Sequence, residues 1–176
     1  MKYLDRILLS SVLILVLLIG TTPFAFSAQD TMPDPPGELV DVGGHELHIY
    51  CLGAGSPTVI LEAGSGVLSL SWRPLQEQIA EYTRVCTYDR AGYGWSDPGP
   101  TPRTALQVAT ELETLLVNAG IDTPIVLAGH SMGGMFVRYF AATHHDTVAG
   151  VVLVDASPPK IATIRAGIME FDRLLQ

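Results

Sequence analysis

The 176-residue sequence has few of the residues that build metal sites, nucleic-acid surfaces or disulfide frameworks. It contains only two cysteines, and 10 Lys and Arg stand against 18 Asp and Glu, for a net charge of −8. Two separated thiols with no CxxC pair and no nearby histidine pair argue against a zinc site, so we expect no metal ion and no other cofactor. Because the basic residues are scarce and unclustered, we expect no nucleic-acid partner.

A long apolar run occurs only at the start of the chain. Lys2 and Arg6 precede the uninterrupted apolar segment Val12–Ile19, and Ala25-Phe26-Ser27 supplies small residues at the spacing that a signal peptidase recognises. This order predicts that residues 1–27 are a secretory signal peptide. Since the segment from Ile7 to Phe26 is about 20 residues long, enough to span a bilayer, an uncleaved membrane anchor is the alternative. We therefore expect the protein to be exported, to the periplasm or the cell exterior, or anchored to the membrane.

Short apolar runs recur along the rest of the chain. Residues 28–37 are rich in proline and lack periodicity, which predicts a linker. Residues 39–53 alternate apolar and polar side chains on either side of Gly43-Gly44, which predicts a β-hairpin. The continuous apolar runs that follow are typical of strands buried on both faces. They read PTVILEAG, RVCTYD, PIVLAG and VAGVVLVD.

Segments with helical periodicity alternate with these runs. The clearest is 101–120, which we expect Thr101 to cap and Gly120 to end. Shorter helices are expected over 72–82 and 132–144. Strands that alternate with helices predict a mostly parallel sheet flanked by helices, an α/β fold.

One turn carries a chemical signature. Residues Gly129 to Gly133 read G-x-S-x-G, between an apolar strand and an apolar helix. Such a turn is strained, and it lifts the Ser131 hydroxyl clear of the sheet only if residues two positions away are small, as Gly129 and Gly133 are. The alternative is a plain glycine-rich turn between strand and helix, as in a nucleotide-binding fold. The flanking strand and helix favour the catalytic interpretation.

With two further motifs, this turn makes the sequence resemble the α/β-hydrolase superfamily in its bacterial serine-hydrolase branch. The resemblance extends over Gly37–Pro159: EAGSG stands in the oxyanion-loop position, YDRAGYGWSDPG matches the loop after the fourth strand, and GHSMGG is the nucleophile turn. It implies that Ser131 is the nucleophile and that the N–H groups of Ser65 and Met132 form the oxyanion hole. Ala63 replaces a common histidine, but backbone donors do not depend on that side chain.

The resemblance also implies roles for neighbouring residues. Asp89 and Arg90 are expected to brace the loop after the fourth strand rather than to react. Trp72 and Trp95 are expected either to line an acyl pocket or to pack in the core. His130 is expected to pack away from the reacting group.

The base that a serine nucleophile requires is missing from the sequence. In this fold the triad follows the order serine, acid, histidine, and the only histidines after Ser131 are His144 and His145. They fall at the far end of the predicted helix, roughly 18 Å from the hydroxyl, whereas hydrogen-bond reach is about 3 Å. His45 and His48 belong to the opening hairpin and are expected to be surface or strand-face residues.

The last part of the sequence suggests an incomplete fold. Asp155 follows the final apolar run, and two roles remain open for it: triad acid, or a carboxylate that only accepts from nearby loop N–H groups. Residues 160–176 begin a helix where the resemblance places a cap or lid, before later strands that this chain does not contain. We therefore expect 38–159 to be a truncated α/β-hydrolase core with negligible turnover. Without later strands, Val151–Val154 would have an exposed apolar edge.

Cys51 and Cys86 have two open interpretations. The resemblance places their strands side by side, and an exported protein with cysteines on neighbouring strands can form a disulfide. Two buried free thiols are the equal alternative.

Two classes of function are therefore in view. The first is a serine hydrolase that acts on a small-molecule carboxylic ester or a related acyl bond, with peptidase and acyltransferase chemistry open because they use the same residues. The second is a non-catalytic fragment or binding module that retains the front part of the fold.

Overall fold

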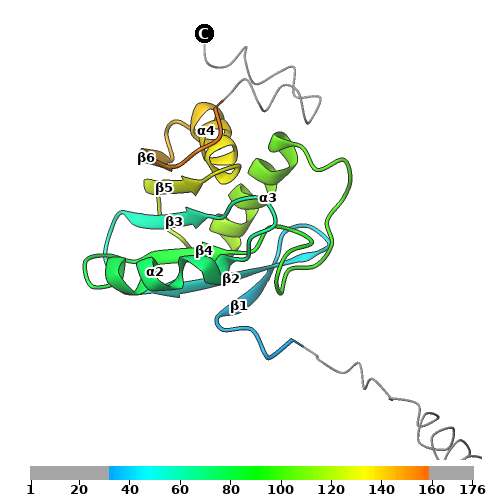
Figure 1. Ribbon diagram of the computed structural model, residues 1–176, viewed down its shortest axis with the longest axis horizontal. Coiled ribbons are helices and arrows are strands. Elements are labelled where there is room, and N and C mark those ends of the chain that lie inside the picture. Colours follow the sequence, from blue (N-terminus) through cyan, green and yellow to red (C-terminus); the bar gives the residue numbers. More distant parts are fainter. Residues whose placement is uncertain (1–31, 159–176) are drawn as a thin grey trace, which may run out of the picture. The chain divides into compact units, whose positions relative to one another are not determined.

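The computed structural model describes residues 32–158. Within them, six strands form one sheet: β1 (Glu38–Asp41), β2 (Glu46–Leu52), β3 (Thr58–Glu62), β4 (Val85–Tyr88), β5 (Ile125–His130) and β6 (Val148–Val154). Their order is β1-β2-β4-β3-β5-β6 (Figure 1). The four strands β4, β3, β5 and β6 pair in parallel, and β1 and β2 add an antiparallel hairpin to one edge. The predicted mostly parallel sheet and its opening hairpin are confirmed.

Helices cover both faces of this sheet (Figure 1). They are a short 3₁₀ turn η1 (Ser69–Trp72), α2 (Arg73–Ile79), α3 (Ala105–Asn118) and α4 (Gly133–Thr143). Successive strand residues point to opposite faces, so Leu127 packs in the large core under α3 and α4 while Ala128 packs in the smaller core that contains Trp72. The sheet is therefore buried from two sides, which explains the continuous apolar runs of its strands.

The α3 cap differs from the one expected. Thr104, not Thr101, precedes the helix, and its side chain accepts a hydrogen bond from the Gln107 N–H at 3.1 Å. In the segment before the helix, the Arg103 guanidinium donates to both carboxylate oxygens of Glu111. The prediction for Thr101 is therefore wrong, whereas the predicted exit is confirmed, since Gly120 has a positive φ of 60°.

The helix expected over 72–82 is shorter in the structure. α2 ends at Ile79, and the N–H groups of Tyr82 and Thr83 both donate to the Ile79 carbonyl in a turn. This turn leads the chain into β4, so the predicted helix continued too far.

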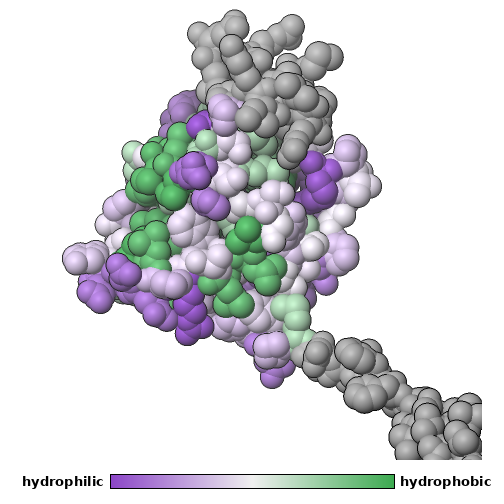
Figure 2. Space-filling model, viewed as in Figure 1, coloured by the Kyte–Doolittle hydropathy of each residue, from purple (hydrophilic) through white to green (hydrophobic). Residues whose placement is uncertain are grey.

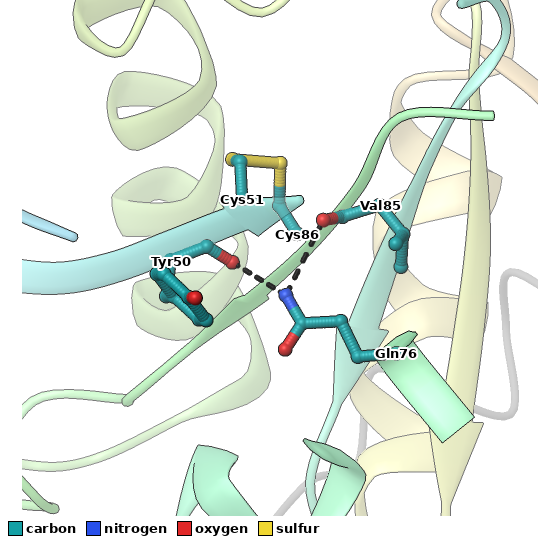
Figure 3. The surroundings of a disulfide bond; sticks show 5 residues. All are labelled: Tyr50, Cys51, Gln76, Val85 and Cys86. Carbon is teal, nitrogen blue, oxygen red and sulfur yellow. Dashed lines mark hydrogen bonds between the residues drawn. A yellow bond between two sulfur atoms is a disulfide. The ribbon is translucent and has the colours of Figure 1, made fainter. Parts of the chain in front are cut away.

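Cys51 and Cys86 form a disulfide between β2 and β4. They are direct partners in the antiparallel register, with Cα atoms 4.0 Å apart. The buried Gln76 amide crosses the same two strands, since its Nε2 donates to the carbonyls of Tyr50 at 2.8 Å and Val85 at 3.3 Å (Figure 3). The hairpin is thus joined to the parallel strands by a covalent bond and by a buried side chain.

The described end of the predicted linker contacts the core. Residues 32–37 contain no helix or strand, but the Pro33 carbonyl accepts from Trp95 Nε1 at 2.7 Å and the Pro36 carbonyl contacts His48 Nε2. Two carbonyls of this proline-rich stretch are therefore bound by side chains of β2 and of the loop after β4. The predicted export segment, 1–27, and the predicted cap helix, 160–176, lie outside the described residues. Within 32–158, none of the helices has the length and apolar character needed to cross a bilayer.

The β6 edge of the sheet exposes apolar side chains. Val151, Val152, Leu153 and Val154 are 37–51% exposed, and green apolar surface gathers on the side of the molecule where β6 lies (Figure 2). Among the described strands, β6 pairs with β5 alone. The apolar edge expected from the sequence is present in this part of the chain.

The disulfide yields a stability prediction. Replacement of Cys51 and Cys86 together by alanine is expected to lower the free energy of unfolding by about 2–4 kcal/mol, because the bridge restricts the unfolded chain. Denaturant titration of both proteins measures the difference. A thiol count on the denatured, non-reduced wild type serves as the control, and two free thiols would show that the bridge does not form.

Candidate active site

The four parallel strands deliver their carboxyl ends to one side of the sheet. The segments that follow them are Ala63–Gly66 after β3, Asp89–Arg90 after β4, Ser131 after β5 and Asp155 after β6. Open α/β sheets bind ligands at this side. The residues singled out in the sequence are therefore brought to one region by topology.

Ser131 has the strained backbone that the motif requires. Its φ is +51°, in the left-handed region that non-glycine residues rarely adopt. The strain is held by hydrogen bonds on both sides, because the Ser131 N–H donates to the Val154 carbonyl at 3.1 Å and the Ser131 carbonyl accepts from Gly134 and Ser157. Ser131 thus stands between the end of β5 and the start of α4, anchored to the segment after β6.

The glycines around Ser131 are required by close backbone contacts. A Cβ atom at Gly129 would lie 2.7 Å from the Gly133 carbonyl oxygen and from Val137. A Cβ atom at Gly133 would lie 2.6 Å from the carbonyl oxygens of both Glu62 and Ala63. The turn therefore packs directly on the end of β3, which places the loop after β3 beside the serine.

The loop after β3 lies next to Ser131, as the oxyanion prediction requires. A Cβ atom at Gly64 would lie 3.4 Å from the Ser131 Cβ, so the two backbones adjoin. Within residues 32–158, the N–H groups of Ser65 and Met132 donate to no acceptor. Met132 also caps α4, whose first N–H groups carry partial positive charge.

A buried charged cluster lies under this loop. Glu62, at the end of β3, accepts hydrogen bonds from the Tyr88 hydroxyl and from Arg90 Nη1, and all three side chains are nearly inaccessible. Burial raises the pKa of Glu62, and the Arg90 charge and the Tyr88 hydroxyl oppose that rise. Arg90 also donates to the carbonyls of Ala63 at 2.6 Å and Gly64 at 2.8 Å.

A second buried cluster centres on Asp89. Its carboxylate contacts His48 Nδ1 at 2.9 Å and accepts from the Ser69 N–H at 2.8 Å. Burial alone would raise the pKa of Asp89, but the hydrogen bonds from His48 and Ser69 outweigh it and hold the pKa below its usual value. His48 is fully buried and packs beside the Trp95 ring. Of the two roles expected for His48, the surface role is wrong: it is a residue of strand β2 whose side chain is buried against Asp89.

None of the five histidines of the sequence, all within the described residues, forms a hydrogen bond with Ser131. His130 meets Trp72 edge to face, with ring centroids 6.3 Å apart. The other four pair elsewhere: His45 with Glu111, His48 with Asp89, His144 with Glu113 and His145 with Asp146. Within the described residues, no histidine is therefore hydrogen-bonded to Ser131 as a general base would be.

Asp155 is exposed and adopts a left-handed backbone with φ of +43°. Its carboxylate forms no hydrogen bond within residues 32–158. The flanking residues touch the serine turn, since the Val154 carbonyl and the Ser157 N–H both bond to Ser131. The residue lies next to the site, but within the described chain its carboxylate orients no other side chain.

A cavity of about 160 Å³ opens beside Met132. Apolar side chains from the Arg90 loop, α3 and α4 form most of its wall, and two guanidinium groups border it. Its lining residues are Arg90, Ala91, Tyr93, Arg103, Val108, Met132, Met135 and Phe136. Trp72 and Trp95 are not among them. Within the described part of the chain, no three His, Cys, Asp or Glu side chains gather as a metal site.

The buried Glu62 cluster was not predicted, although a signal for it is present in the sequence. Glu62 ends one otherwise apolar strand, in VILE, and Arg90 follows another, in VCTYDR. Charged side chains at such positions are rarely buried unless they are paired. The pairing itself joins segments 28 residues apart and depends on the strand order.

The family described as α/β hydrolase fold matches residues 57–170. The probable transporter efuK of Hormonema carpetanum is 35% identical over 127 residues, which cover 68% of this chain and 18% of that protein. Cfl2 of Burkholderia cenocepacia is 29% identical with a TM-score of 0.65, over 69% of this chain and 42% of that one. A thermophilic esterase of Thermogutta terrifontis is 29% identical with a TM-score of 0.61, over 73% and 48%.

The similarity is to part of each relative. The chain spans 18–50% of the length of the first three curated relatives that it matches, and under half of both solved structures just described. The described sheet thus corresponds to only part of the fold of these relatives.

The contacts of Gly133 yield a prediction. Gly133→Ala is expected to destabilise the fold by about 1–3 kcal/mol, because the new methyl group meets two backbone carbonyls that cannot move freely. Gly150→Ala, whose methyl group would meet nothing within 4 Å, is the matched control and is expected to leave stability within about 1 kcal/mol. Denaturant titration compares the two. Equal stability of both variants would mean that the turn does not pack on β3.

The Asp89 cluster predicts a pH dependence. Because the pKa of Asp89 is lowered by folding, its stabilisation is present above the unfolded value near 3.8 and is lost as the pH falls through the folded pKa. The wild type should therefore be more stable than Asp89→Asn at pH 7, and the difference should shrink below about pH 4. Unfolding midpoints measured against pH test this. The exposed Asp122→Asn is the control, and a gap between wild type and Asp89→Asn that does not change with pH would contradict the assignment.

Proposed function

Because this chain belongs to the α/β-hydrolase family, we propose that it carries the nucleophile and oxyanion hole of a serine hydrolase that cleaves carboxylic esters or a related acyl bond. The observation that supports this most directly is the left-handed backbone of Ser131, held between β5 and α4. Strain of this kind persists only where the surrounding structure enforces it, and it concentrates at functional sites. An esterase is among the solved structures that this chain resembles.

The proposed reaction is acyl transfer to Ser131. The Ser131 oxygen attacks the carbonyl carbon of the ester, its proton passes to a base, and the carbonyl oxygen becomes an oxyanion. The N–H groups of Ser65 and Met132 stabilise that charge. The carbon–oxygen bond to the alcohol then breaks, the alcohol leaves with a proton, and water later releases the acid from the acyl-enzyme.

The cavity beside Met132 is the proposed place for an apolar part of the substrate. Its wall is mostly apolar, and both of its arginines already pair with glutamates, Arg90 with Glu62 and Arg103 with Glu111. With these charges neutralised, the cavity suits a small apolar group better than an anion.

The missing imidazole limits the activity that we propose for these 176 residues. Without a base, oxyanion donors and binding alone leave only about 10³–10⁴-fold acceleration over water. We therefore propose that turnover is very low unless a histidine is supplied from outside this sequence, with Asp155 or another carboxylate as its partner. The same observation favours, as a second candidate, a binding role that uses the site without turnover.

We also propose that the protein functions outside the cytoplasm, exported or anchored by residues 1–27. The Cys51–Cys86 disulfide supports this, because such bonds persist in oxidising compartments.

Labelling with a fluorophosphonate tests the nucleophile. The reagent phosphonylates an activated serine with loss of fluoride, and intact mass followed by peptide mapping locates the adduct. We expect slow addition at Ser131, acceleration when imidazole is added to the buffer as an external base, and no adduct in Ser131→Ala. The exposed Ser71→Ala should behave as the wild type does.

Each other outcome overturns part of the proposal. Absence of an adduct at Ser131 even with imidazole would contradict the serine hydrolase and leave the binding role. Rapid stoichiometric labelling without imidazole would show that the chain contains a base after all.

A further inference from the structure

We propose that Arg90 is a positioning residue that aims the Ser65 N–H at the oxyanion, an inference that rests on the proposed function. Arg90 follows β4, and its hydrogen bonds within the described residues go to Glu62, Ala63 and Gly64 and not to Ser131. It acts instead on the backbone of the loop after β3.

The contacts of Arg90 fall on two successive peptide groups. Nη1 donates to the Ala63 carbonyl at 2.6 Å and Nη2 donates to the Gly64 carbonyl at 2.8 Å. The Gly64 carbonyl belongs to the same peptide group as the Ser65 N–H. Because a trans peptide is planar and its C=O and N–H point in opposite directions, a guanidinium that holds the carbonyl also fixes where the N–H points.

The same contact strengthens the donor. A charge-assisted hydrogen bond to the carbonyl polarises the peptide group, and hydrogen bonds in such chains reinforce one another. The Ser65 N–H, on the far side of that group, is therefore both oriented and made a better donor to developing negative charge. It has no acceptor of its own within residues 32–158, so it is available to a ligand.

The loop depends on Arg90 because its own side chains are too small to anchor it. Residues 63–66 read Ala-Gly-Ser-Gly, and none of their side chains forms a hydrogen bond within the described residues. The Ser65 side chain is exposed. Orientation of this loop must come from a neighbouring element.

Arg90 is itself held rigidly. Only 5% of its side chain is exposed, Glu62 pairs with Nη1, and the guanidinium carbon lies 4.8 Å from the Tyr93 ring centroid and 5.3 Å from that of Phe136. A guanidinium offers a planar fork that reaches two carbonyls at once, which a lysine ammonium cannot reproduce. The arrangement is formed before substrate binds, as catalytic preorganisation requires.

A simpler role for Arg90 is to neutralise the buried Glu62 charge. The two roles separate in the double variant Glu62→Gln/Arg90→Met, which removes both charges together and avoids a lone buried carboxylate. If Arg90 only neutralises Glu62, the double variant should regain wild-type behaviour. If Arg90 orients the Ser65 peptide, the defect should remain.

The experiment measures fluorophosphonate labelling of Ser131, with imidazole present, in the wild type, Arg90→Met, Glu62→Gln/Arg90→Met, Arg90→Lys and the exposed control Arg73→Met. We expect both Met variants to lose about 10- to 100-fold in the maximal labelling rate with little change in reagent affinity, less than the loss of an oxyanion donor outright. Arg90→Lys should lose less, and Arg73→Met nothing. Labelling of the double variant at the wild-type rate would overturn the proposal.

A second measurement does not depend on Ser131 chemistry. The backbone amide resonance of Ser65 is recorded by ¹H–¹⁵N NMR in the wild type and in the folded double variant. We expect it to shift and broaden when Arg90 is lost, while the amide of Gly120 on the far end of α3 stays unchanged. If the wild type fails to label, the serine hydrolase proposal fails and this amide still decides the role of Arg90; an unchanged Ser65 resonance overturns it.

Discussion

The candidate site depends on the close contact between the first turn of α4 and the end of β3, where no side chain larger than hydrogen fits at Gly133. This contact sets the distance between the serine turn and the loop that carries Ser65. Because both partners are backbone, the spacing does not depend on the rotamer of any side chain. The candidate nucleophile and the candidate oxyanion donor are therefore parts of one rigid unit.

Two adjacent residues after β4, Asp89 and Arg90, connect β2, η1 and the loop after β3 through buried hydrogen bonds. Asp89 accepts from η1 and contacts His48 on β2, while Arg90 binds the loop after β3. Their charges are buried, and each is matched by a charged or polar partner, as burial demands. Since these partners lie on β2, on η1 and at the end of β3, the two residues link segments that are far apart in the sequence.

Much of this arrangement could be predicted from the sequence because it follows from local patterns. The apolar runs predicted the parallel strands, and the spacing of Gly129, Ser131 and Gly133 predicted the strained turn. The α3 cap was predicted wrongly because two threonines, Thr101 and Thr104, both suit a cap, and the local pattern does not distinguish them. The burial of His48 was missed for a similar reason: its partner Asp89 lies 41 residues away, and only the strand order brings them together.

The proposed serine-hydrolase chemistry needs two kinds of parts, which differ in how the structure supplies them. The strained backbone of Ser131 and the donors beside it are held by contacts of the serine turn with β3, α4 and the segment after β6. A base must reach the hydroxyl by its side chain, and the structure commits every histidine to another partner or places it away from Ser131. The backbone donors proposed to stabilise an oxyanion can therefore be in place in a structure that holds no base beside Ser131 within the described residues. Oxyanion stabilisation uses backbone N–H groups and buried charges, whereas proton transfer needs only one side chain. An imidazole from another source would therefore supply the proposed base without any change in the sheet.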